Sequence, residues 1–385
     1  MSLIGQSITV LGAGIAGLAA ARALALRGAD VTVLEQTEAI REVGAGLQIS
    51  PNGAAVLKAL GLGAALETAG VAAQSVALNE GLSGDLVLRL DVARRGYWFL
   101  HRADLIDLLA AGAREAGVQI RLMHRIEAVE LSGSRPRVVT DLGTVFEPEL
   151  LIGADGINSR VRVALNGTEK PFFTNQVAWR TVIPETAGVL PVAEVFMGPG
   201  RHLVSYPLRG GTLRNIVAVE ERRRWAQESW SLKDDPMEMR VAFERFAPRA
   251  RAWLDAAESV HLWGLFRHPV ATRWHGRNAA ILGDAAHPTL PFLAQGANMA
   301  LEDAWVLAES LAGHDTVEAG LAAYQAARVG RTRRIVDAAS TNARVYHLGT
   351  PFREIAHLGL KIGGTVAPGL VLDRFNWIYN HDVTA

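Results

Sequence analysis

The sequence predicts an α/β protein that begins with a Rossmann-type parallel unit, carries an inserted antiparallel sheet and ends in helices. A short β-branched strand at 7–11, a helical run at 15–27 and a second strand at 31–35 form a βαβ unit. The segment 193–220 alternates strands with Gly-Pro-Gly and Arg-Gly-Gly turns, which is typical of an antiparallel meander. Helical periodicity follows at 320–347. Because 385 residues exceed an ordinary single core, we expect two structural regions.

Composition and charge argue against several classes of protein. The chain is 49% hydrophobic and 20% charged, which favours a compact globular protein. Its 39 basic residues balance 39 acidic ones, so we expect small-molecule partners and neither nucleic acid nor a membrane. The absence of cysteine excludes disulfides, thiolate nucleophiles and sulfur-ligated metals, and no metal site is expected. The apolar N-terminal stretch lacks a preceding basic region and is interrupted by Arg22, so we expect a cytoplasmic protein without a signal peptide.

The βαβ unit carries a dinucleotide-binding fingerprint. Gly12 permits a tight turn, Gly14 lets the backbone approach a pyrophosphate, and Gly17 allows close helix packing. The helix N-terminus presents its positive dipole end to phosphates, and Glu35 at the end of the second strand reaches a ribose hydroxyl. Glu35 favours FAD or NAD over NADP, whose ribose carries a further phosphate. The fingerprint does not separate FAD from NAD.

Two later motifs separate these cofactors. GADGINSRVR at 153–162 and GDAAHP at 283–288 each place an aspartate after an apolar strand, and each read alone is a capped turn. Together with GAGIAG at 12–17, EVGAGLQISPN at 42–52 and HRADL at 101–105, they resemble the single-component (group A) FAD-dependent aromatic hydroxylases. This family includes salicylate hydroxylase, 3-hydroxybenzoate 6-hydroxylase and 6-hydroxynicotinate 3-monooxygenase. The resemblance covers essentially the whole chain.

The resemblance implies FAD as the bound cofactor, NADH or NADPH as a transient cosubstrate, and O2 and a small aromatic substrate as further partners. In this family a flavin C4a-hydroperoxide transfers oxygen to an activated ring. No second Rossmann fingerprint is present, which agrees with transient binding of the nicotinamide nucleotide. The residues that the resemblance assigns to cofactor binding are Gly12, Gly14, Gly17, Glu35, Gln48, Arg102, Asp155, Gly156, Asp284, Pro291, Gly296, Ala297 and Asn298.

Several of these implied roles suit the side chains. Asp284 would accept a hydrogen bond from a ribityl hydroxyl, and Arg102 would lie beside the flavin and the pyrophosphate. Backbone N–H groups at the start of the helix near 296 would stabilise negative charge on reduced flavin. The family usually has glycine where this chain has Ala294, so a requirement for glycine's φ would alter the loop or the mobility of the flavin. His287 is expected to be structural.

A histidine and a tyrosine share one face of the strand RHLVSYP. Alternation places His202 and Tyr206 on the same side, where composition alone predicts core residues satisfied by their neighbours. The resemblance favours a pocket instead, because these ring hydroxylases carry His and Tyr four apart on the sheet that faces the flavin. Their implied catalytic roles are withdrawal of a phenolic proton by His202 and orientation of the hydroxyl or carboxylate by Tyr206. Arg180 and Arg209 are candidate partners for a substrate carboxylate, although ordinary surface charge is the simpler expectation.

The expected function is hydroxylation of a small hydroxylated aromatic acid with NAD(P)H and O2. An epoxidase acting on a larger apolar substrate and a non-catalytic flavin-binding protein remain alternatives, and a homodimer is left open. A flavin halogenase is disfavoured because Thr181, not a tryptophan, stands two positions after Trp179. The arginines at 328, 331, 333 and 334 are expected on a solvated helix face, and the aromatic tail at 373–382 is expected to pack on the body.

The expected domain organisation is discontinuous. We expect an FAD-binding domain from 1–70, 97–172 and 265–320, a substrate domain from 71–96 and 173–264, and a C-terminal helical segment from 321–385.

Overall fold

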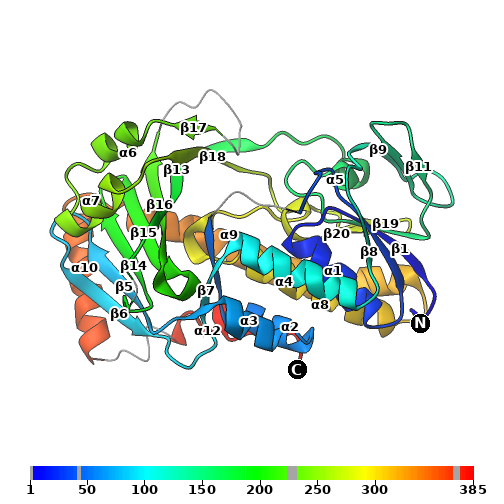
Figure 1. Cartoon of the computed structure of the whole chain (residues 1–385), viewed down its shortest axis with the longest axis horizontal. Helices are drawn as coiled ribbons and strands as arrows, with labels where there is room; N and C mark the ends of the chain where they lie inside the picture. Colours follow the sequence, from blue (N-terminus) through cyan, green and yellow to red (C-terminus); the bar gives the residue numbers. More distant parts are fainter. Residues whose placement is uncertain (1–2, 41–44, 187, 223–231, 367–372) are drawn as a thin grey trace.

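The computed structural model describes residues 3–40, 45–186, 188–222, 232–366 and 373–385, and it contains two large sheets with helices around them (Figure 1). The first sheet has six strands, and all of its pairings are parallel except the one at its β19 edge. Its strands in spatial order are β19 (His275–Gly276), β20 (Ala279–Ile281), β12 (Leu150–Gly153), β1 (Ser7–Leu11), β2 (Asp30–Leu34) and β8 (Gln119–Arg121).

The predicted βαβ unit is confirmed as β1, α1 (Ile15–Ala25) and β2. The helix ends two residues earlier than predicted, and the second strand begins and ends one residue earlier. Glu35 therefore stands immediately after β2. Helix α1 packs between α4 (Arg102–Glu115) and α8 (Gly296–Ala312) over a core of fully buried aliphatic side chains. This packing fixes the end of β1 where the fingerprint glycines begin.

The second large sheet has eight strands, and it joins segments that are distant in the sequence. Every neighbouring pair in it is antiparallel except β14 and β5, which run parallel. The predicted meander is confirmed as β14, β15 and β16. The strands in spatial order are β17 (Lys233–Asp234), β18 (Val260–Arg267), β13 (Phe172–Pro184), β16 (Leu213–Glu221), β15 (Arg201–Leu208), β14 (Val192–Gly198), β5 (Ser75–Glu80) and β6 (Leu86–Asp91).

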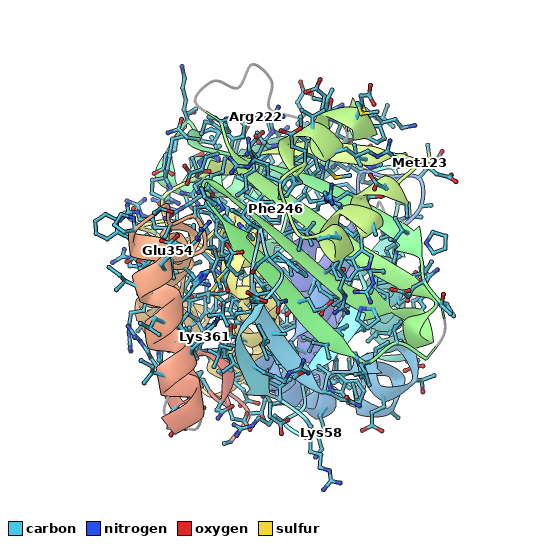
Figure 2. The ribbon with its side chains drawn as sticks, turned by 90° about the vertical axis from the view of Figure 1, so that its left-hand side faces the viewer. Lys58, Met123, Arg222, Phe246, Glu354 and Lys361 are labelled. Carbon is cyan, nitrogen blue, oxygen red and sulfur yellow. The ribbon has the colours of Figure 1, made fainter. Side chains whose placement is uncertain are left out.

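One face of this sheet is closed by a separate apolar core. Helices α6 (Pro236–Ala242) and α7 (Pro248–Asp255) cover it, and Trp179 and Phe243 lie fully buried between helix and sheet. Figure 2 shows helix α10 (Phe352–Val366), which carries Glu354 and Lys361, along the edge of the sheet near β6. The opposite face of the sheet is therefore the one left to line a cavity.

Shorter elements connect the two sheets. Strands β3 (Gly46–Ile49), β7 (Trp98–His101) and β4 (Val71–Ala72) form a small sheet at the junction, and the Gly46 N–H donates to Asn215 Oδ1 at 2.7 Å. The remaining elements are α2 (Pro51–Ala59), α3 (Gly63–Ala69), β9 (Ile126–Glu130), β10 (Arg137–Thr140), β11 (Val145–Phe146) and α5 (Arg160–Asn166). Among the described residues, no helix is long and apolar enough to span a membrane.

In the part of the C-terminal region that the structure describes, the helices are α9 (Val317–Tyr346), α10 and the short α12 (Asn376–Tyr379). The expectation of a solvated arginine face on α9 was wrong for two of the four arginines. Arg328 is 1% exposed and pairs with Glu302 and Asp303, and Arg331 also pairs with Glu302. The reason is that α8 turns adjacent carboxylates towards this side of α9. The tail packs on the body as expected, with Ile378 fully buried.

Candidate functional site

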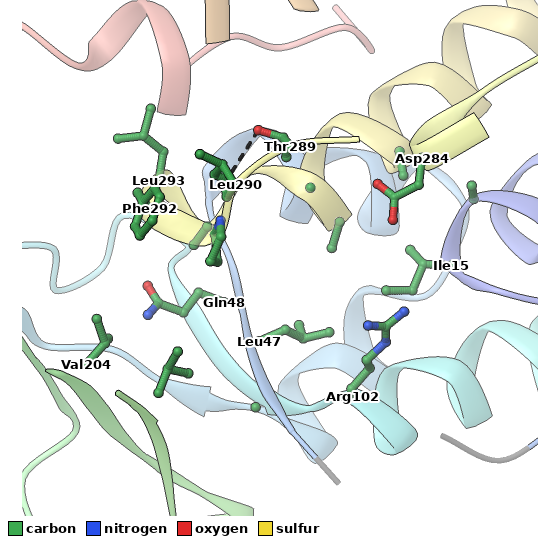
Figure 3. Close-up of a pocket in the computed structure, with 18 of the residues that line it drawn as sticks. Ile15, Leu47, Gln48, Arg102, Val204, Asp284, Thr289, Leu290, Phe292 and Leu293 are labelled. Carbon is green, nitrogen blue, oxygen red and sulfur yellow. Dashed lines mark hydrogen bonds between the residues drawn. The ribbon is translucent and has the colours of Figure 1, made fainter. Parts of the chain in front are cut away.

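A cavity of about 1320 Å³ lies between the two large sheets. This exceeds the roughly 300–1,000 Å³ of most small-molecule pockets, so it has room for a dinucleotide and a second ligand. Figure 3 shows side chains from several elements at this cavity: Val204 on β15, Gln48 on β3, Arg102 at the start of α4 and Asp284 in the turn after β20. Predicted cofactor residues at its wall are Gly12, Gly14, Glu35, Gln48, Arg102, Asp155, Gly156, Asp284, Pro291, Gly296 and Ala297. Gly17 and Asn298 do not line it.

The fingerprint glycines fit a bound pyrophosphate for different physical reasons. Gly12 has φ +96°, and a Cβ there would lie 2.5 Å from the Ala154 carbonyl oxygen. A Cβ on Gly17 would lie 1.9 Å from the Gly12 carbonyl oxygen, so Gly17 permits contact between helix and strand. Gly14 has φ −78°, and no heavy atom lies within 4 Å of a Cβ built on it. Because Gly14 has no side chain, the cavity beside it is open, and a phosphate group has room to approach the backbone.

Glu35 is held rigidly at this end of the cavity. Its Oε2 accepts the Ala13 N–H at 2.8 Å, and its Oε1 accepts the N–H and hydroxyl of Thr37 at 2.9 and 3.0 Å. Each carboxylate oxygen has two lone-pair sites, so a ribose hydroxyl can still bind. Glu35 thus combines a fixed position with remaining acceptor capacity.

Two aspartates approach the middle of the cavity from separate strand ends. Asp155 follows β12, its Oδ2 accepts the Arg160 N–H at 2.7 Å, and burial raises its pKa. Asp284 follows β20, and its side chain is exposed to the cavity. Desolvation by the surrounding protein raises the pKa of Asp284, and the nearby His287 and Arg102 counteract that rise. Figure 3 places Asp284 and Arg102 across the cavity from each other. An anionic acceptor and a cation facing one space suit a ligand with both hydroxyls and phosphates.

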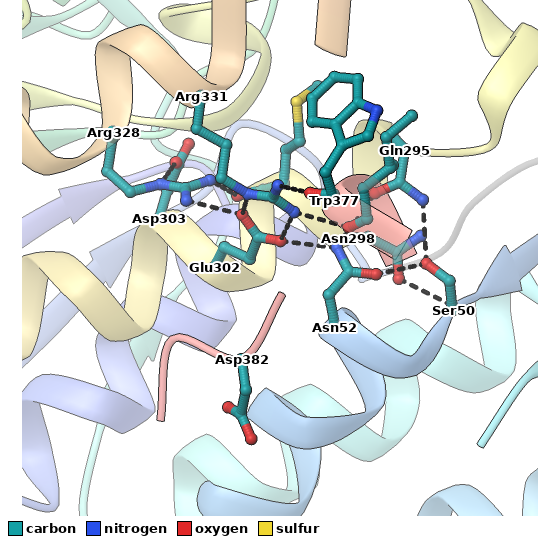
Figure 4. Close-up of polar contacts among 12 residues, drawn as sticks. Ser50, Asn52, Gln295, Asn298, Glu302, Asp303, Arg328, Arg331, Trp377 and Asp382 are labelled. Carbon is teal, nitrogen blue, oxygen red and sulfur yellow. Dashed lines mark hydrogen bonds and ion pairs between the residues drawn. The ribbon is translucent and has the colours of Figure 1, made fainter. Parts of the chain in front are cut away.

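A polar network behind the cavity fixes the start of α8 (Figure 4). Asn298 accepts the Ser50 N–H at 3.0 Å and donates to the carbonyls of Gln48 and Ala294 at 3.0 and 2.7 Å. Gln295 donates to Ser50 Oγ at 2.9 Å. The first three N–H groups of a helix have no intrahelical acceptor, so those of Gly296 and Ala297, which line the cavity, remain available to a ligand. The Asn298 side chain therefore positions the loop from behind the cavity.

Ala294 adopts φ 51° and ψ 35°, the left-handed conformation that favours glycine. This strain costs a residue with a Cβ about 1–2 kcal/mol, whereas glycine loses about 0.5–1 kcal/mol of conformational entropy on folding. We expect Ala294→Gly to raise the free energy of unfolding by about 0.5 kcal/mol, measured by urea denaturation. Ala322→Gly, at an exposed position of α9, is the matched control and should lower that free energy by about 1 kcal/mol. Destabilisation of equal size in both variants would contradict the strained loop.

His202 stands in a hydrogen-bonded chain that leads away from the cavity. It is 1% exposed, and its Nδ1 lies 2.7 Å from Nε2 of His347. The other ring nitrogen of His347, Nδ1, lies 2.8 Å from Oε1 of Glu221, whose side chain is 53% exposed. Burial, and then the nearby His347, hold the pKa of His202 well below its usual value. The His202 ring is therefore neutral near pH 7.

Tyr206 lies on the same wall, with its ring centroid 5.1 Å from that of Phe99. Burial raises its pKa, and Arg180 opposes the rise, which places that cation in its vicinity. Arg180 lines the cavity with its guanidinium carbon 4.0 Å from the centre of a Trp263 ring. Arg209 instead forms an ion pair with Asp104 at 2.7 Å and does not line the cavity.

Sequence reasoning missed several residues of this site. Tyr97 donates its hydroxyl to Gln48 Oε1 at 2.7 Å, and Tyr379 from the tail also lines the cavity. His347 lies 145 residues from the histidine it contacts, so no local pattern could have indicated it. Glu42, within the motif at 42–52, lies outside the described residues.

Comparison with known proteins agrees with this geometry. The FAD binding domain family matches residues 6–339. The chain is 33% identical to 3-hydroxybenzoate 6-hydroxylase of Polaromonas naphthalenivorans (strain CJ2), covering 98% of this chain and 96% of that protein. It is 35% identical to 3-amino-4-hydroxybenzoate 2-monooxygenase of Streptomyces cremeus, covering 89% and 88%. The crystal structure of Klebsiella pneumoniae HpxO complexed with FAD and uric acid superposes with a TM-score of 0.82 at 25% identity, covering 94% and 95%. The chain belongs to the FAD binding domain family.

Proposed function

We propose that this chain is an FAD-dependent monooxygenase that uses NADH or NADPH and O2 to hydroxylate an aromatic ring bearing a hydroxyl and a carboxylate. The observation that carries the proposal is that His202 and Tyr206 line the same cavity as the fingerprint glycines Gly12 and Gly14 and as Asp284. The two relatives support it, because their names give 3-hydroxybenzoate and 3-amino-4-hydroxybenzoate as substrates. When bound, FAD supplies the redox chemistry of hydride acceptance and O2 activation.

Different cavity-lining residues would bind different parts of FAD. Gly14 and the N-terminus of α1 would hold the pyrophosphate, and Glu35 would hold the adenosine ribose. Asp284 would bind a ribityl hydroxyl, and the N–H groups of Gly296 and Ala297 would face the pyrimidine edge of the flavin. Gly17 and Asn298 would act from behind the cavity, through helix packing and loop position.

Glu221 sets the tautomers of the two histidines. A carboxylate can only accept, so Nδ1 of His347 carries the proton that it donates to Glu221. Neutral His347 then offers Nε2 as an acceptor, and His202 donates its Nδ1–H to it. Nε2 of His202 is left with a lone pair. His202 would take the ring hydroxyl proton there and pass its Nδ1 proton through His347 towards the half-exposed carboxylate.

Replacement of His202 by Asn should leave the bound phenol without its base. We expect about a 10²-fold loss of coupled hydroxylation. We also expect the pH at which the bound ring becomes a phenolate, read from its absorbance, to rise by at least about one unit. His347→Gln should shift the same pH upward by less, because His202 remains. His275→Asn, at a half-buried histidine outside the cavity, should leave it unchanged. An unchanged phenolate titration in His202→Asn would remove this role.

Arg180 is the proposed partner of the substrate carboxylate. It lies on β13, two strands from β15, and it is near enough to oppose the rise that burial causes in the pKa of Tyr206. Stacking on Trp263 fixes its guanidinium, which would then bind a carboxylate in a defined orientation.

The function is tested by measuring the ratio of hydroxylated product formed to NADH or NADPH consumed. The FAD-loaded protein is supplied with NADH or NADPH at fixed O2 and with salicylate, 3-hydroxybenzoate, 4-hydroxybenzoate or 6-hydroxynicotinate. Product and hydrogen peroxide are measured together. Product that matches the nucleotide consumed supports the proposal. Bound FAD with no stimulation by any ring compound would instead favour the non-catalytic alternative.

A further inference from the structure

The sheet face that lines the cavity changes in chemical character from one edge to the other. Strands β13, β16, β15, β14, β5 and β6 lie side by side in that order. Their register aligns one row of cavity-lining residues: Arg180, Val217, Val204, Val195, Leu78 and Leu88. Arg180 lies at one end of this row. Strand β15, which carries His202 and Tyr206, contributes Val204 near its middle. The rest of the row is aliphatic.

Beyond β15, every residue of this sheet that lines the cavity is apolar within the described chain. These residues are Ala193, Val195 and Met197 on β14, Val76 and Leu78 on β5, and Leu88 and Leu90 on β6. From β15 to β6 there are three strand spacings, or about 14 Å. A single ring held at His202 and Tyr206 does not reach across that floor.

Part of the aliphatic floor is uncovered. Val195, Met197 and Leu88 are only 5%, 1% and 4% exposed, but Val76, Leu78 and Leu90 are partly exposed. On β5 the apolar Val76 and Leu78 remain partly exposed, whereas the polar Ser75 and Asn79 on the opposite face are only 5% and 6% exposed. This inversion of the usual pattern occurs where the sheet meets the cavity. Leu360 of α10 and Tyr346 at the end of α9 pack against parts of the floor and also line the cavity. An apolar ligand group gains free energy by covering such a surface, whereas a polar group loses its hydration there.

We propose that the substrate carries an alkyl chain of several carbons on the side of the ring opposite its carboxylate. The alkyl chain would lie over Val76 and Leu78 of β5 and Leu90 of β6, beside the part of the floor that α10 covers. Arg180 would bind the carboxylate and His202 the hydroxyl. This inference rests on the proposed function for the orientation of the ring. Arg180, His202 and the aliphatic floor follow one another in this order across the sheet, and this order determines where the alkyl chain would lie.

The inference is tested by binding. Dissociation constants of 2-hydroxybenzoate and 3-hydroxybenzoate and of their 4-methyl, 4-propyl and 4-pentyl derivatives are measured from flavin absorbance in the FAD-loaded protein without NAD(P)H. Each added CH2 should tighten binding about fourfold in the series that fits. Leu78→Ser should reduce this gain per carbon. Leu86→Ser, on β6 but 46% exposed and outside the cavity, should leave the gain unchanged.

The same measurements separate this inference from the reaction itself. A dissociation constant that does not change with chain length, or binding that weakens for the pentyl compounds, overturns the alkyl subsite even where the unsubstituted acids are hydroxylated. Tightening with chain length but no product from any compound keeps the subsite and overturns the hydroxylase. No binding by any compound overturns both.

Discussion

Gly17→Ala should strongly destabilise the FAD-binding region. A Cβ at this position would lie 1.9 Å from the Gly12 carbonyl oxygen and 3.2 Å from the Ala154 Cβ. Backbone cannot yield as a side chain does, so α1 would have to move away from β1. Overpacking in a rigid core costs about 1–3 kcal/mol or more, and contact with backbone belongs at the upper end. We expect about 3 kcal/mol of destabilisation, measured by urea unfolding of the FAD-free protein, together with loss of FAD during purification.

Gly14→Ala is the matched control for that result. Its Cβ would meet no atom within 4 Å, and its φ of −78° suits alanine. We expect the unfolding free energy of the FAD-free protein to change by less than about 0.5 kcal/mol. We expect FAD to bind at least tenfold more weakly, because a methyl group would enter the space proposed for the pyrophosphate. Unchanged FAD affinity in Gly14→Ala would contradict the proposed position of the pyrophosphate. Equal loss of stability in both variants would mean that packing alone explains both glycines.

The sequence predicts the parts of this protein that local patterns encode. The βαβ unit follows from β-branched strands, a glycine spacing and a helical run that agree with one another, and β1, α1 and β2 lie within two residues of expectation. The meander follows from its glycine turns. The parallel pairing of β14 with β5 joins residues more than a hundred positions apart, and no local pattern specifies it.

The same distinction holds for the site. Glu35, Asp155 and Asp284 follow strand ends that the sequence marks, and all three line the cavity. The chain from His202 through His347 to Glu221 depends on how the end of α9 packs on β15 and β16, which helical periodicity does not report. Arg328 is a second example of a contact that local sequence does not predict. An arginine on a long helix is expected to be solvated, but here Glu302 and Asp303 of the neighbouring helix α8 form buried ion pairs with it.

Arg328→Met should cost about 3–5 kcal/mol, because it leaves buried carboxylates without one of their counter-ions. Arg328 lies 2.6 Å from Glu302 Oε2 and 2.8 Å from Asp303 Oδ1. These carboxylates support the proposed cofactor site. Asp303 accepts the Gly283 N–H at 3.0 Å beside Asp284. Glu302 accepts from Asn52 at 2.6 Å (Figure 4). We therefore expect weaker FAD binding as well as a lower unfolding free energy. Arg333→Met, at an exposed position of the same helix, should change the unfolding free energy by less than about 0.5 kcal/mol.

The pH dependence of that loss identifies its cause. Burial alone would raise the pKa of Asp303, but His287 and Arg328 hold it below its usual 3.8. In the unsubstituted protein this carboxylate therefore stabilises the fold above about pH 4 and loses that contribution as the pH falls through its folded pKa. Without Arg328 the folded pKa should move above 3.8, so the folded variant takes up a proton as the pH falls. The difference in unfolding free energy between the two proteins should then shrink from pH 7 to pH 5 in FAD-saturated urea titrations. A difference that is constant over this range would mean that lost packing, and not uncompensated charge, accounts for the destabilisation.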